Sequence, residues 1–391
     1  MKILLISKHF WPENFRINMV ADKISKDHQL DVLSEIPSYH KKLLKDKKIL
    51  NKININRFWT YPRSNSLFSI ILNYLSFLII GTFKIFFLKK KFDLIFIYAT
   101  SPIFQALPAI IYGKIFKVPT VLWVQDLWPD VLQDIKIINN NLILKLVKIF
   151  TNFIYKNSDF VFAQSKSFKK SIRKYSNRNV SILYNPEKKS NTKFLAKKQK
   201  VPTLIFAGNL GKAQNLEFLI KSIKLVKNNL FFIKVFGEGS EKSRLVKLIN
   251  KYKIGNKIKI FKPISPKKLD IELKKSDGFI ITLDKGGALS KTLPAKLQTY
   301  LSFGKPIICS ASGELYNFIR TNNLGFACRV NNQSQIINAF KDFKNLNISK
   351  RRKIFYRSEK IFDSLFELNN WYFNLNKKLY KTVKIYKKSL K

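Results

Sequence analysis

The feature that most constrains the fold of this sequence is a series of short, continuous apolar runs separated by longer segments of helical periodicity. Such runs predict strands buried on both faces, and their alternation with helices is typical of a parallel sheet covered by helices on both sides. In the first half of the chain the predicted strands are 2–7, 30–34, 94–98, 120–124, 160–163 and 181–184.

The second half repeats this pattern after a polar, Lys-rich stretch at 187–200 that follows Asn185-Pro186, a turn-initiating pair. We therefore expect an α/β protein. It would have two Rossmann-like, doubly wound domains at 1–186 and 201–357, a linker at 187–200, and a cleft between the domains. The strands predicted in the second half are 203–206, 233–236, 257–261, 279–283, 306–310 and 325–329.

Composition narrows the class of protein. The sequence is 46% hydrophobic and 14% aromatic, which excludes a mostly disordered chain. The two cysteines, Cys309 and Cys328, are too few for a disulfide scaffold, and we expect both to be buried packing residues. The apolar run at 3–6 is too short for the core of a secretory signal, so it predicts a buried first strand.

The charge favours anionic partners. Among 391 residues, 73 are Lys or Arg and 24 are Asp or Glu, a formal net charge of +49. Such an excess attracts nucleic acid, acidic lipid headgroups or phosphorylated substrates, although a compositional bias toward Lys would produce it too, since the lysines are spread along the whole chain. No helix-turn-helix, zinc or RNA-recognition signature accompanies it, so nucleic acid is not an expected partner.

The segment 67–88 is apolar and about as long as the ~20 residues that a membrane span requires. Lys84 argues against a simple span, because a cation deep in the bilayer is costly. The segment therefore predicts a helix that is buried in the protein or lies in a membrane interface. The following Lys89, Lys90 and Lys91 would sit well against anionic headgroups.

Two glycine-containing turns follow predicted strands of the second half, where ligands of open parallel sheets bind. Each leads into a helix, whose N-terminus offers free N–H groups and a positive dipole end to an anion. Glycine also lets the backbone approach a ligand closely, and Lys212 would add a full charge for a diphosphate unless it is only a solvated surface Lys. The spacing is neither the P-loop pattern nor the dinucleotide fingerprint. The turns comprise Gly208, Asn209, Leu210, Gly211 and Lys212, and Gly237, Glu238 and Gly239.

Three further segments carry polar groups next to strands. A short helix is predicted between Pro294 and Gly304, and Lys296 in its first turn could reach a phosphate or lie on the surface. Asp126 directly follows the strand at 120–124, where a substrate is expected. Trp123 and Trp128 flank it, and these rings could stack on a sugar or pack in the core. The third segment, 8–16, follows the first strand.

The order of these segments resembles GT-B glycosyltransferases of retaining family 4, especially bacterial surface-polysaccharide enzymes of the fucosamine transferase type. The resemblance spans about 1–330. It is carried by residues 11–18, 125–129, 208–216, 237–239 and 294–306.

The resemblance implies transfer of a sugar, without a catalytic metal or other cofactor, from a nucleotide-diphosphate sugar. The expected donor is UDP-linked and carries an N-acetylated amino or deoxy sugar. The acceptor would be a saccharide on a polyprenyl diphosphate in O-antigen or capsule synthesis, with retention at the anomeric carbon. Such an enzyme would be peripheral, at the anionic inner face of the cytoplasmic membrane.

The resemblance also implies roles for residues. Lys212 and the turn before it would hold the diphosphate and stabilise the leaving group. Asp126 would be catalytic, at the donor sugar or the acceptor hydroxyl. The expected donor-binding residues are Gly208, Asn209, Gly211, Lys212, Gly237, Glu238, Gly239, Lys296, Gln298 and Thr299. The expected acceptor-binding residues are Glu13, Asn14, Arg16 and Trp128.

One departure concerns the ribose. Many family members carry two acidic residues with seven residues between them, and the second binds the ribose hydroxyls. Lys291 and Thr299 occupy these positions here, so either Gln298 or Thr299 would have to substitute. The resemblance further implies that a helical segment at 358–391, with Trp371 and Tyr372, crosses back to the first domain.

Two other classes remain open from the sequence. A GT-B sugar-nucleotide epimerase would share the architecture but would not need a lipid-facing helix. A nucleic-acid-binding protein is supported only by the charge. Incubation with labelled sugar nucleotides, with and without a lipid acceptor, separates all three.

Overall fold

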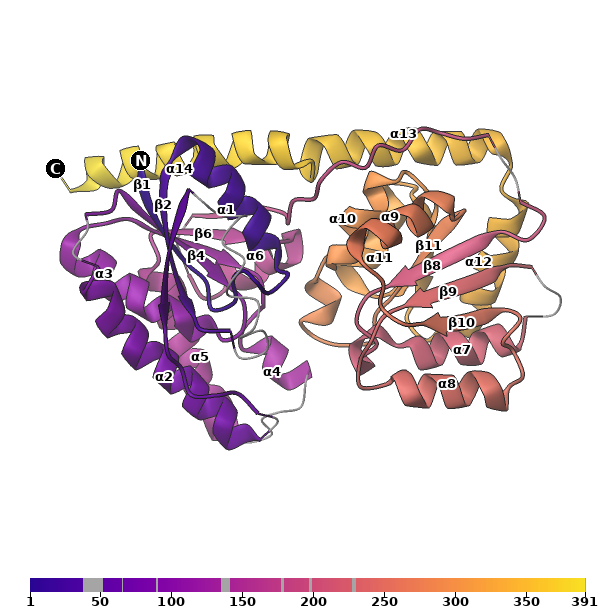
Figure 1. Cartoon of the computed structure of the whole chain (residues 1–391), viewed down its shortest axis with the longest axis horizontal. Helices are drawn as coiled ribbons and strands as arrows, with labels where there is room; N and C mark the ends of the chain where they lie inside the picture. The colour runs from indigo at the N-terminus through magenta and orange to yellow at the C-terminus, as the bar shows by residue number, and fades with distance from the viewer. Residues whose placement is uncertain are drawn as a thin grey trace. The chain divides into compact units, whose positions relative to one another are not determined.

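The computed structural model describes the chain except for residues 38–51, 65, 89–90, 135–140, 177–178, 197–198, 227–229 and 391. The chain divides into two compact units (Figure 1). Unit 1 comprises Met1–Pro186 and Asn369–Lys391, and unit 2 comprises Glu187–Leu368.

Unit 1 is built on a seven-stranded sheet of order β3-β2-β1-β4-β5-β6-β7, with all neighbours parallel. The six strands predicted in this half are confirmed to within two residues. β3 was missed because its sequence alternates Ile with Asn and Arg instead of forming an apolar run. The strands are β1 Lys2–Ile6, β2 Gln29–Glu35, β3 Ile53–Phe58, β4 Leu94–Ala99, β5 Thr120–Val124, β6 Phe160–Ala163 and β7 Val180–Ile182.

Helices cover both faces of this sheet. In Figure 1, α1 and α14 lie on one side of it, and α2, α3 and α5 lie on the other. The chain adds β2 and β3 on one side of β1 and then β4 to β7 on the other side. With right-handed crossovers, this reversal places the helices of the two halves on opposite faces. The helices are α1 Arg16–Asp27, α2 Leu67–Phe86, α3 Leu107–Phe116, α4 Asp130–Asp134, α5 Asn141–Asn157, α6 Lys166–Arg173 and α14 Leu368–Ser389, with a 3₁₀ turn at Ile103–Ala106 before α3.

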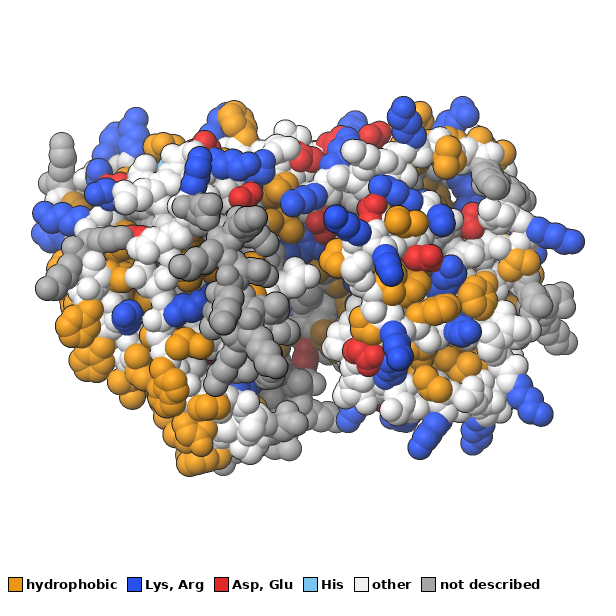
Figure 2. Space-filling view, in the orientation of Figure 1, with side chains coloured by type: hydrophobic (Ala, Val, Ile, Leu, Met, Phe, Trp, Pro, Cys, Tyr) orange, Lys and Arg blue, Asp and Glu red, His pale blue; other side chains and the backbone are white. Residues whose placement is uncertain are grey.

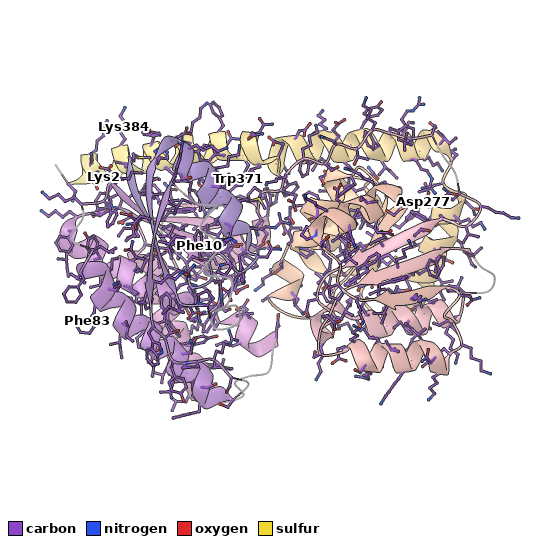
Figure 3. All side chains as sticks on the ribbon, viewed as in Figure 1. Lys2, Phe10, Phe83, Asp277, Trp371 and Lys384 are labelled. Atoms are coloured by element: carbon purple, nitrogen blue, oxygen red, sulfur yellow. The ribbon has the colours of Figure 1, made fainter. Side chains whose placement is uncertain are left out.

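The C-terminal helix belongs to the core of unit 1. Trp371, Leu375 and Leu379 are buried beside β1, β4 and β5, and the Trp371 indole donates a 2.6 Å hydrogen bond to the Tyr184 carbonyl (Figure 3). The helical segment expected from 358 onward differs at its start. Residues 358–365 end α13 (Ile348–Leu365), which belongs to unit 2.

Unit 2 contains a six-stranded parallel sheet of order β10-β9-β8-β11-β12-β13, so all six strands predicted here are confirmed. The strands are β8 Thr203–Ala207, β9 Phe232–Phe236, β10 Ile258–Phe261, β11 Gly278–Thr282, β12 Ile307–Ala311 and β13 Gly325–Arg329. The remaining helices are α7 Leu216–Lys224, α8 Lys242–Lys251, α9 Pro266–Lys275, α10 Ala295–Ser302, α11 Gly313–Thr321 and α12 Gln333–Asn345, with 3₁₀ turns at Lys212–Gln214 and Leu289–Lys291. Cys309 and Cys328 are free and buried.

The segment that the sequence predicts as a linker packs along α13 where the structure describes it. The Glu187 N–H donates to the Phe366 carbonyl at 2.8 Å, and the Phe194 ring lies edge-on to the Phe355 ring, 5.8 Å between centroids. This packing brings the Glu187 side chain into unit 2.

Candidate functional site

The two glycine turns of unit 2 form one layer at the carboxyl edge of the sheet. β8 and β9 are neighbours, and the loops after them are joined by hydrogen bonds from the Gly208 N–H to the Phe236 carbonyl (2.9 Å) and from the Leu210 N–H to the Glu238 carbonyl (2.7 Å). A Cβ at position 237 would lie 1.9 Å from the Gly208 carbonyl oxygen. Gly237 is therefore required by the close approach of the neighbouring loop, and its role in binding the donor stays a prediction.

The same holds for Gly239, which has a φ of +158° and whose added Cβ would lie 2.5 Å from the Leu210 carbonyl carbon. The Glu238 side chain is mostly exposed and pairs with Lys242. Gly208 and Asn209 are exposed on this layer. The turn at 208–211 is thus the part of the layer that a ligand can reach.

Lys296 lies directly beneath this turn. A Cβ at Gly208 would be 2.7 Å from its Cε and 3.1 Å from its Nζ, so only glycine fits there. Its ammonium donates to the Gln214 side-chain oxygen and lies 4.6 Å from the centre of the Phe206 ring. The interpretation of Lys296 as a plain surface Lys is therefore wrong.

The electrostatics of Lys296 are those of an anion site. Burial lowers its pKa to about 8. Within the part of the chain that the structure describes, no carboxylate is paired with it. A half-buried cation without a negative partner is stabilised by an anionic ligand, which removes the penalty of desolvation.

Lys212 is exposed and begins a 3₁₀ turn, Lys212–Gln214, that separates the glycine turn from α7. The helix that the sequence predicts after this turn is confirmed as α7. Asn215, at φ +49°, caps α7, and Glu217 in the first turn of that helix pairs with Lys221. The positive end of α7 is thus partly compensated, and the lysines are the stronger attraction for an anion.

Neither residue proposed for the ribose is free. Gln298 is buried, and its amide nitrogen donates to the Pro294 and Ala295 carbonyls at 2.9 Å each, so the expectation that it binds the donor is wrong. The Thr299 hydroxyl donates to the carboxylate of Glu187 at 2.7 Å. Glu187 is not recognisable from the sequence, because Asn-Pro-Glu is typical of a polar linker. A carboxylate thus stands beside the position where the resembling family has its second acid.

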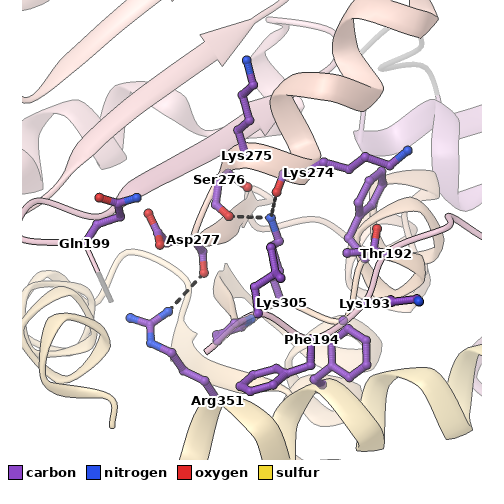
Figure 4. A pocket seen from close by; sticks show the side chains of 15 residues that line it. Thr192, Lys193, Phe194, Gln199, Lys274, Lys275, Ser276, Asp277, Lys305 and Arg351 are labelled. Atoms are coloured by element: carbon purple, nitrogen blue, oxygen red, sulfur yellow. Dashed lines mark hydrogen bonds between the residues drawn. The ribbon is translucent and has the colours of Figure 1, made fainter. Parts of the chain in front are cut away.

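A cavity of about 450 Å³ in unit 2 lies at the opposite, amino end of the strands (Figure 4). Lys305 projects there, and its ammonium donates to the carbonyls of Leu273 (2.8 Å) and Lys274 (2.6 Å) at the end of α9. Arg351 likewise donates to the carbonyls of Asp277 and Phe343. Both cations are engaged by backbone carbonyls, and ligands of such sheets bind at the other edge, so this cavity is not the candidate donor site.

In unit 1 the candidate site is formed by the loops after β1, β4 and β5, which are neighbours in the sheet. Asp126 accepts hydrogen bonds from the Ser101 N–H and hydroxyl, both 2.7 Å. Burial raises the pKa of Asp126, while the bonds from Ser101 and the nearby His9 oppose that shift. The carboxylate is therefore held between a desolvating environment and two donors that stabilise its charge.

Both tryptophans near Asp126 are buried, so of the two alternatives the sequence left open, packing in the core holds, and the expectation that Trp128 contacts the acceptor is wrong. Trp123 is 0% exposed and donates to the Leu183 carbonyl at 2.9 Å. Trp128 is 3% exposed, packs edge-on against Phe104 and donates to the Ser101 hydroxyl at 3.1 Å. Trp128 thus fixes the serine that holds Asp126.

The loop after β1 contains a residue that the sequence analysis did not select. The His9 ring lies 2.9 Å from the Glu13 carboxylate and stacks on Phe15, with centroids 4.9 Å apart. Glu13 is 8% exposed, so its role as an acceptor contact would act mainly through His9. A histidine four residues before an acid, after a strand, is the signal that could have found this pair.

Asn14 is exposed, and the Arg16 guanidinium donates to the Pro186 carbonyl within unit 1. Among the described residues, no group of three or more His, Cys, Asp or Glu side chains is arranged to hold a metal ion. The site residues described above can supply anion binding in unit 2 and hydrogen bonding or proton transfer in unit 1.

Comparisons with known proteins identify a domain in unit 2. Residues 187–360 match the family described as Glycosyl transferases group 1. No curated protein matches the sequence.

Solved structures match over nearly the whole chain. The Anabaena Alr3699/HepE structure in complex with UDP is 13% identical and has a TM-score of 0.74, covering 97% of this chain and 100% of that one. A glycosyltransferase from Rickettsia africae ESF-5 is 16% identical with a TM-score of 0.68, covering 100% and 98%. The lipopolysaccharide outer core galactosyltransferase WaaB is 14% identical with a TM-score of 0.66, covering 97% and 99%.

At these identities the likeness establishes the fold, which is GT-B with two Rossmann-like α/β domains. With the family match over unit 2, the protein is a glycosyltransferase that contains a Glycosyl transferases group 1 domain.

Proposed function

We propose that unit 2 binds a nucleotide-diphosphate sugar at the turn 208–211, with Lys212 and Lys296 on the diphosphate. The observation that carries this proposal is the position of the Lys296 ammonium against Gly208, without a carboxylate partner among the described residues. Burial also lowers the pKa of this ammonium. The structures of Alr3699/HepE in complex with UDP and with UDP-glucose support UDP as the nucleotide. The donor sugar we propose is an N-acetylated amino or deoxy sugar.

The proposed acceptor is a saccharide on a polyprenyl diphosphate, bound by unit 1, in the synthesis of a surface polysaccharide such as O-antigen or capsule. This finer assignment rests on the resemblance to the surface-polysaccharide subgroup of family 4. It is supported by the fold shared with WaaB, a lipopolysaccharide galactosyltransferase. The enzyme would work peripherally at the inner face of the cytoplasmic membrane.

Three side chains would act in the proposed reaction, which retains the anomeric configuration. Negative charge develops on the nucleotide diphosphate as it leaves, and preorganised cations such as Lys296 and Lys212 stabilise that charge without reorganisation. Asp126, held by Ser101, would orient the acceptor hydroxyl or accept its proton.

The proposal is tested with radiolabelled UDP-sugars, with and without a polyprenyl-diphosphate-linked saccharide fraction. Transfer of label into the lipid fraction, dependent on that acceptor, is the expected result. A change of the free sugar nucleotide into its epimer without an acceptor would identify an epimerase instead. Retention is read from the anomeric configuration of the product.

A further inference from the structure

The outer surface of α2 is an apolar stripe. Its exposed large hydrophobic residues recur every three or four positions, so they lie on one side of the helix, away from the sheet. Phe68 is 70% exposed and Phe83 is 64% exposed, and Figure 3 shows Phe83 pointing outward. The stripe consists of Phe68, Ile71, Leu75, Ile79 and Phe83.

The two neighbouring helices extend this stripe. α3 contacts both α2 and α5, so the three helices form one layer. Figure 2 shows hydrophobic side chains gathered over α2 and α3. Contiguous apolar patches beyond a few hundred Å² are rare on soluble monomers and mark interaction sites. We call the exposed outer side of these helices the α2–α3–α5 face, to which α3 adds Ile111, Ile115 and Phe116, and α5 adds Leu146, Ile149 and Phe153.

The charge of this face has one sign. The three helices contain no Asp or Glu. They carry five lysines: Lys84, Lys114, Lys145, Lys148 and Lys156. Lys91 beyond α2 is also exposed, whereas Lys89 and Lys90, which the sequence analysis places against headgroups, lie outside the described residues.

From this we propose that the α2–α3–α5 face docks onto an anionic lipid bilayer, with its hydrophobic residues at the acyl boundary and its lysines at the headgroups. Apolar stripes flanked by lysines are the composition of helices that lie in the membrane interface. A second copy of the chain fits less well, since a symmetric contact would bring the same lysines face to face without acids. The inference deepens the proposed function, because a polyprenyl-linked acceptor remains in the bilayer.

Docking, and not insertion, follows from how α2 is held. By length and composition Phe68–Phe86 could cross a membrane, and 28% of this stretch is buried. Its residue Asn73 is 0% exposed, accepts from the Lys8 ammonium at 2.7 Å and donates to the Tyr61 carbonyl at 2.7 Å. The same ammonium pairs with Glu35 at 2.8 Å. Pulling α2 away would remove the Asn73 hydrogen bond from this buried Lys8–Glu35 ion pair, so α2 remains on the sheet.

The test is sedimentation of the full chain with vesicles of phosphatidylcholine alone or mixed with phosphatidylglycerol. We expect binding to the anionic vesicles, at least ten-fold weaker binding to neutral ones, and release by high salt, because the attraction fades beyond a Debye length of about 8 Å at physiological ionic strength.

Paired substitutions locate the surface. Ile79→Gln with Phe83→Gln on α2, and Leu146→Gln with Ile149→Gln on α5, should each weaken binding at least ten-fold. Lys145→Gln with Lys148→Gln should weaken it by about five-fold per charge. All these side chains are exposed, so circular dichroism and thermal melting should be unchanged. The matched control is Phe373→Gln with Ile385→Gln on α14, exposed hydrophobic residues of the same unit, which should bind as the parent.

Four results would overturn the proposal: no binding to either vesicle, equal loss in the α14 control, salt-resistant binding released only by detergent, or a dimer that the α2 and α5 variants abolish while vesicle binding persists. UDP binding, measured by calorimetry without lipid, separates this proposal from the proposed function. The docking variants should bind UDP as the parent does. A parent protein that does not bind UDP would count against the donor site alone.

Discussion

The Thr299 hydroxyl donates a 2.7 Å hydrogen bond to the carboxylate of Glu187, which belongs to the segment 187–200, whose described residues pack along α13. Thr299 occupies the position at which many enzymes of the resembling family carry the acid that binds the ribose hydroxyls. The carboxylate missing from α10 is thus present in unit 2, supplied by a distant segment.

If Glu187 binds the ribose, its loss should matter only when the hydroxyls are present. We expect the parent to bind UDP about ten-fold or more tightly than 2′-deoxy-UDP, the difference expected for a charge-assisted hydrogen bond. Glu187→Gln should reduce that ratio to near one. Calorimetry with both nucleotides measures it, with Glu367→Gln as the control. An unchanged ratio in Glu187→Gln would assign Glu187 to packing.

Lys296 should make binding of the diphosphate depend on pH. Its pKa is about 8 in the folded protein, so its charge is present below that value and is lost as the pH rises through it. UDP affinity should therefore fall above pH 8 in the parent. Lys296→Met should bind UDP weakly at every pH, so its affinity should depend less on pH. Uridine, which has no phosphate, serves as the control ligand. A parental profile in Lys296→Met would exclude this role.

Although Lys296→Met should weaken UDP binding, it should make the folded protein more stable. The folded pKa of Lys296 lies below its ordinary value of 10.5, so the folded state disfavours the charge. Lys296→Met should raise the melting temperature at pH 7, and the gain should shrink as the pH approaches 10.5. Thermal melts at several pH values check this. A destabilised variant at pH 7 would mean that the ammonium is satisfied in the free protein.

Lys212 should also contribute to binding of the diphosphate. Its replacement by Ala removes a charged donor, worth about 1.5–3 kcal/mol for a charge-assisted hydrogen bond. We expect UDP affinity, measured by calorimetry, to fall ten-fold or more. Exposed Lys253 is the matched control. Unchanged affinity in Lys212→Ala would remove it from the site.

Asp126→Asn should reduce sugar transfer by about 10²–10⁴-fold while leaving UDP affinity intact. Ser101→Ala removes one of the donors that oppose the raised pKa of Asp126, so the acidic limb of its rate profile should shift to higher pH. Steady-state rates across pH measure both. Turnover within a few-fold of the parent in Asp126→Asn would make the carboxylate structural.

Much of the architecture could be predicted from the sequence because strands buried on both faces need continuous apolar residues wherever they occur. Twelve strands were therefore located, whereas β3, with polar residues at alternate positions, was not. The family resemblance similarly depends on short segments whose order is written in the chain.

Only the tertiary structure decided which side chains of those segments are available. Lys296 and Gly208, or Glu187 and Thr299, are far apart in sequence, and their contact depends on how loops and helices pack. Trp128 and Gln298 have side chains of the kind that contact ligands, but both are buried and make hydrogen bonds within the protein. The sequence determined strands and motif order through local hydrophobicity. Packing determined the site, because burial and hydrogen-bond partners are properties of residues brought together from different parts of the chain.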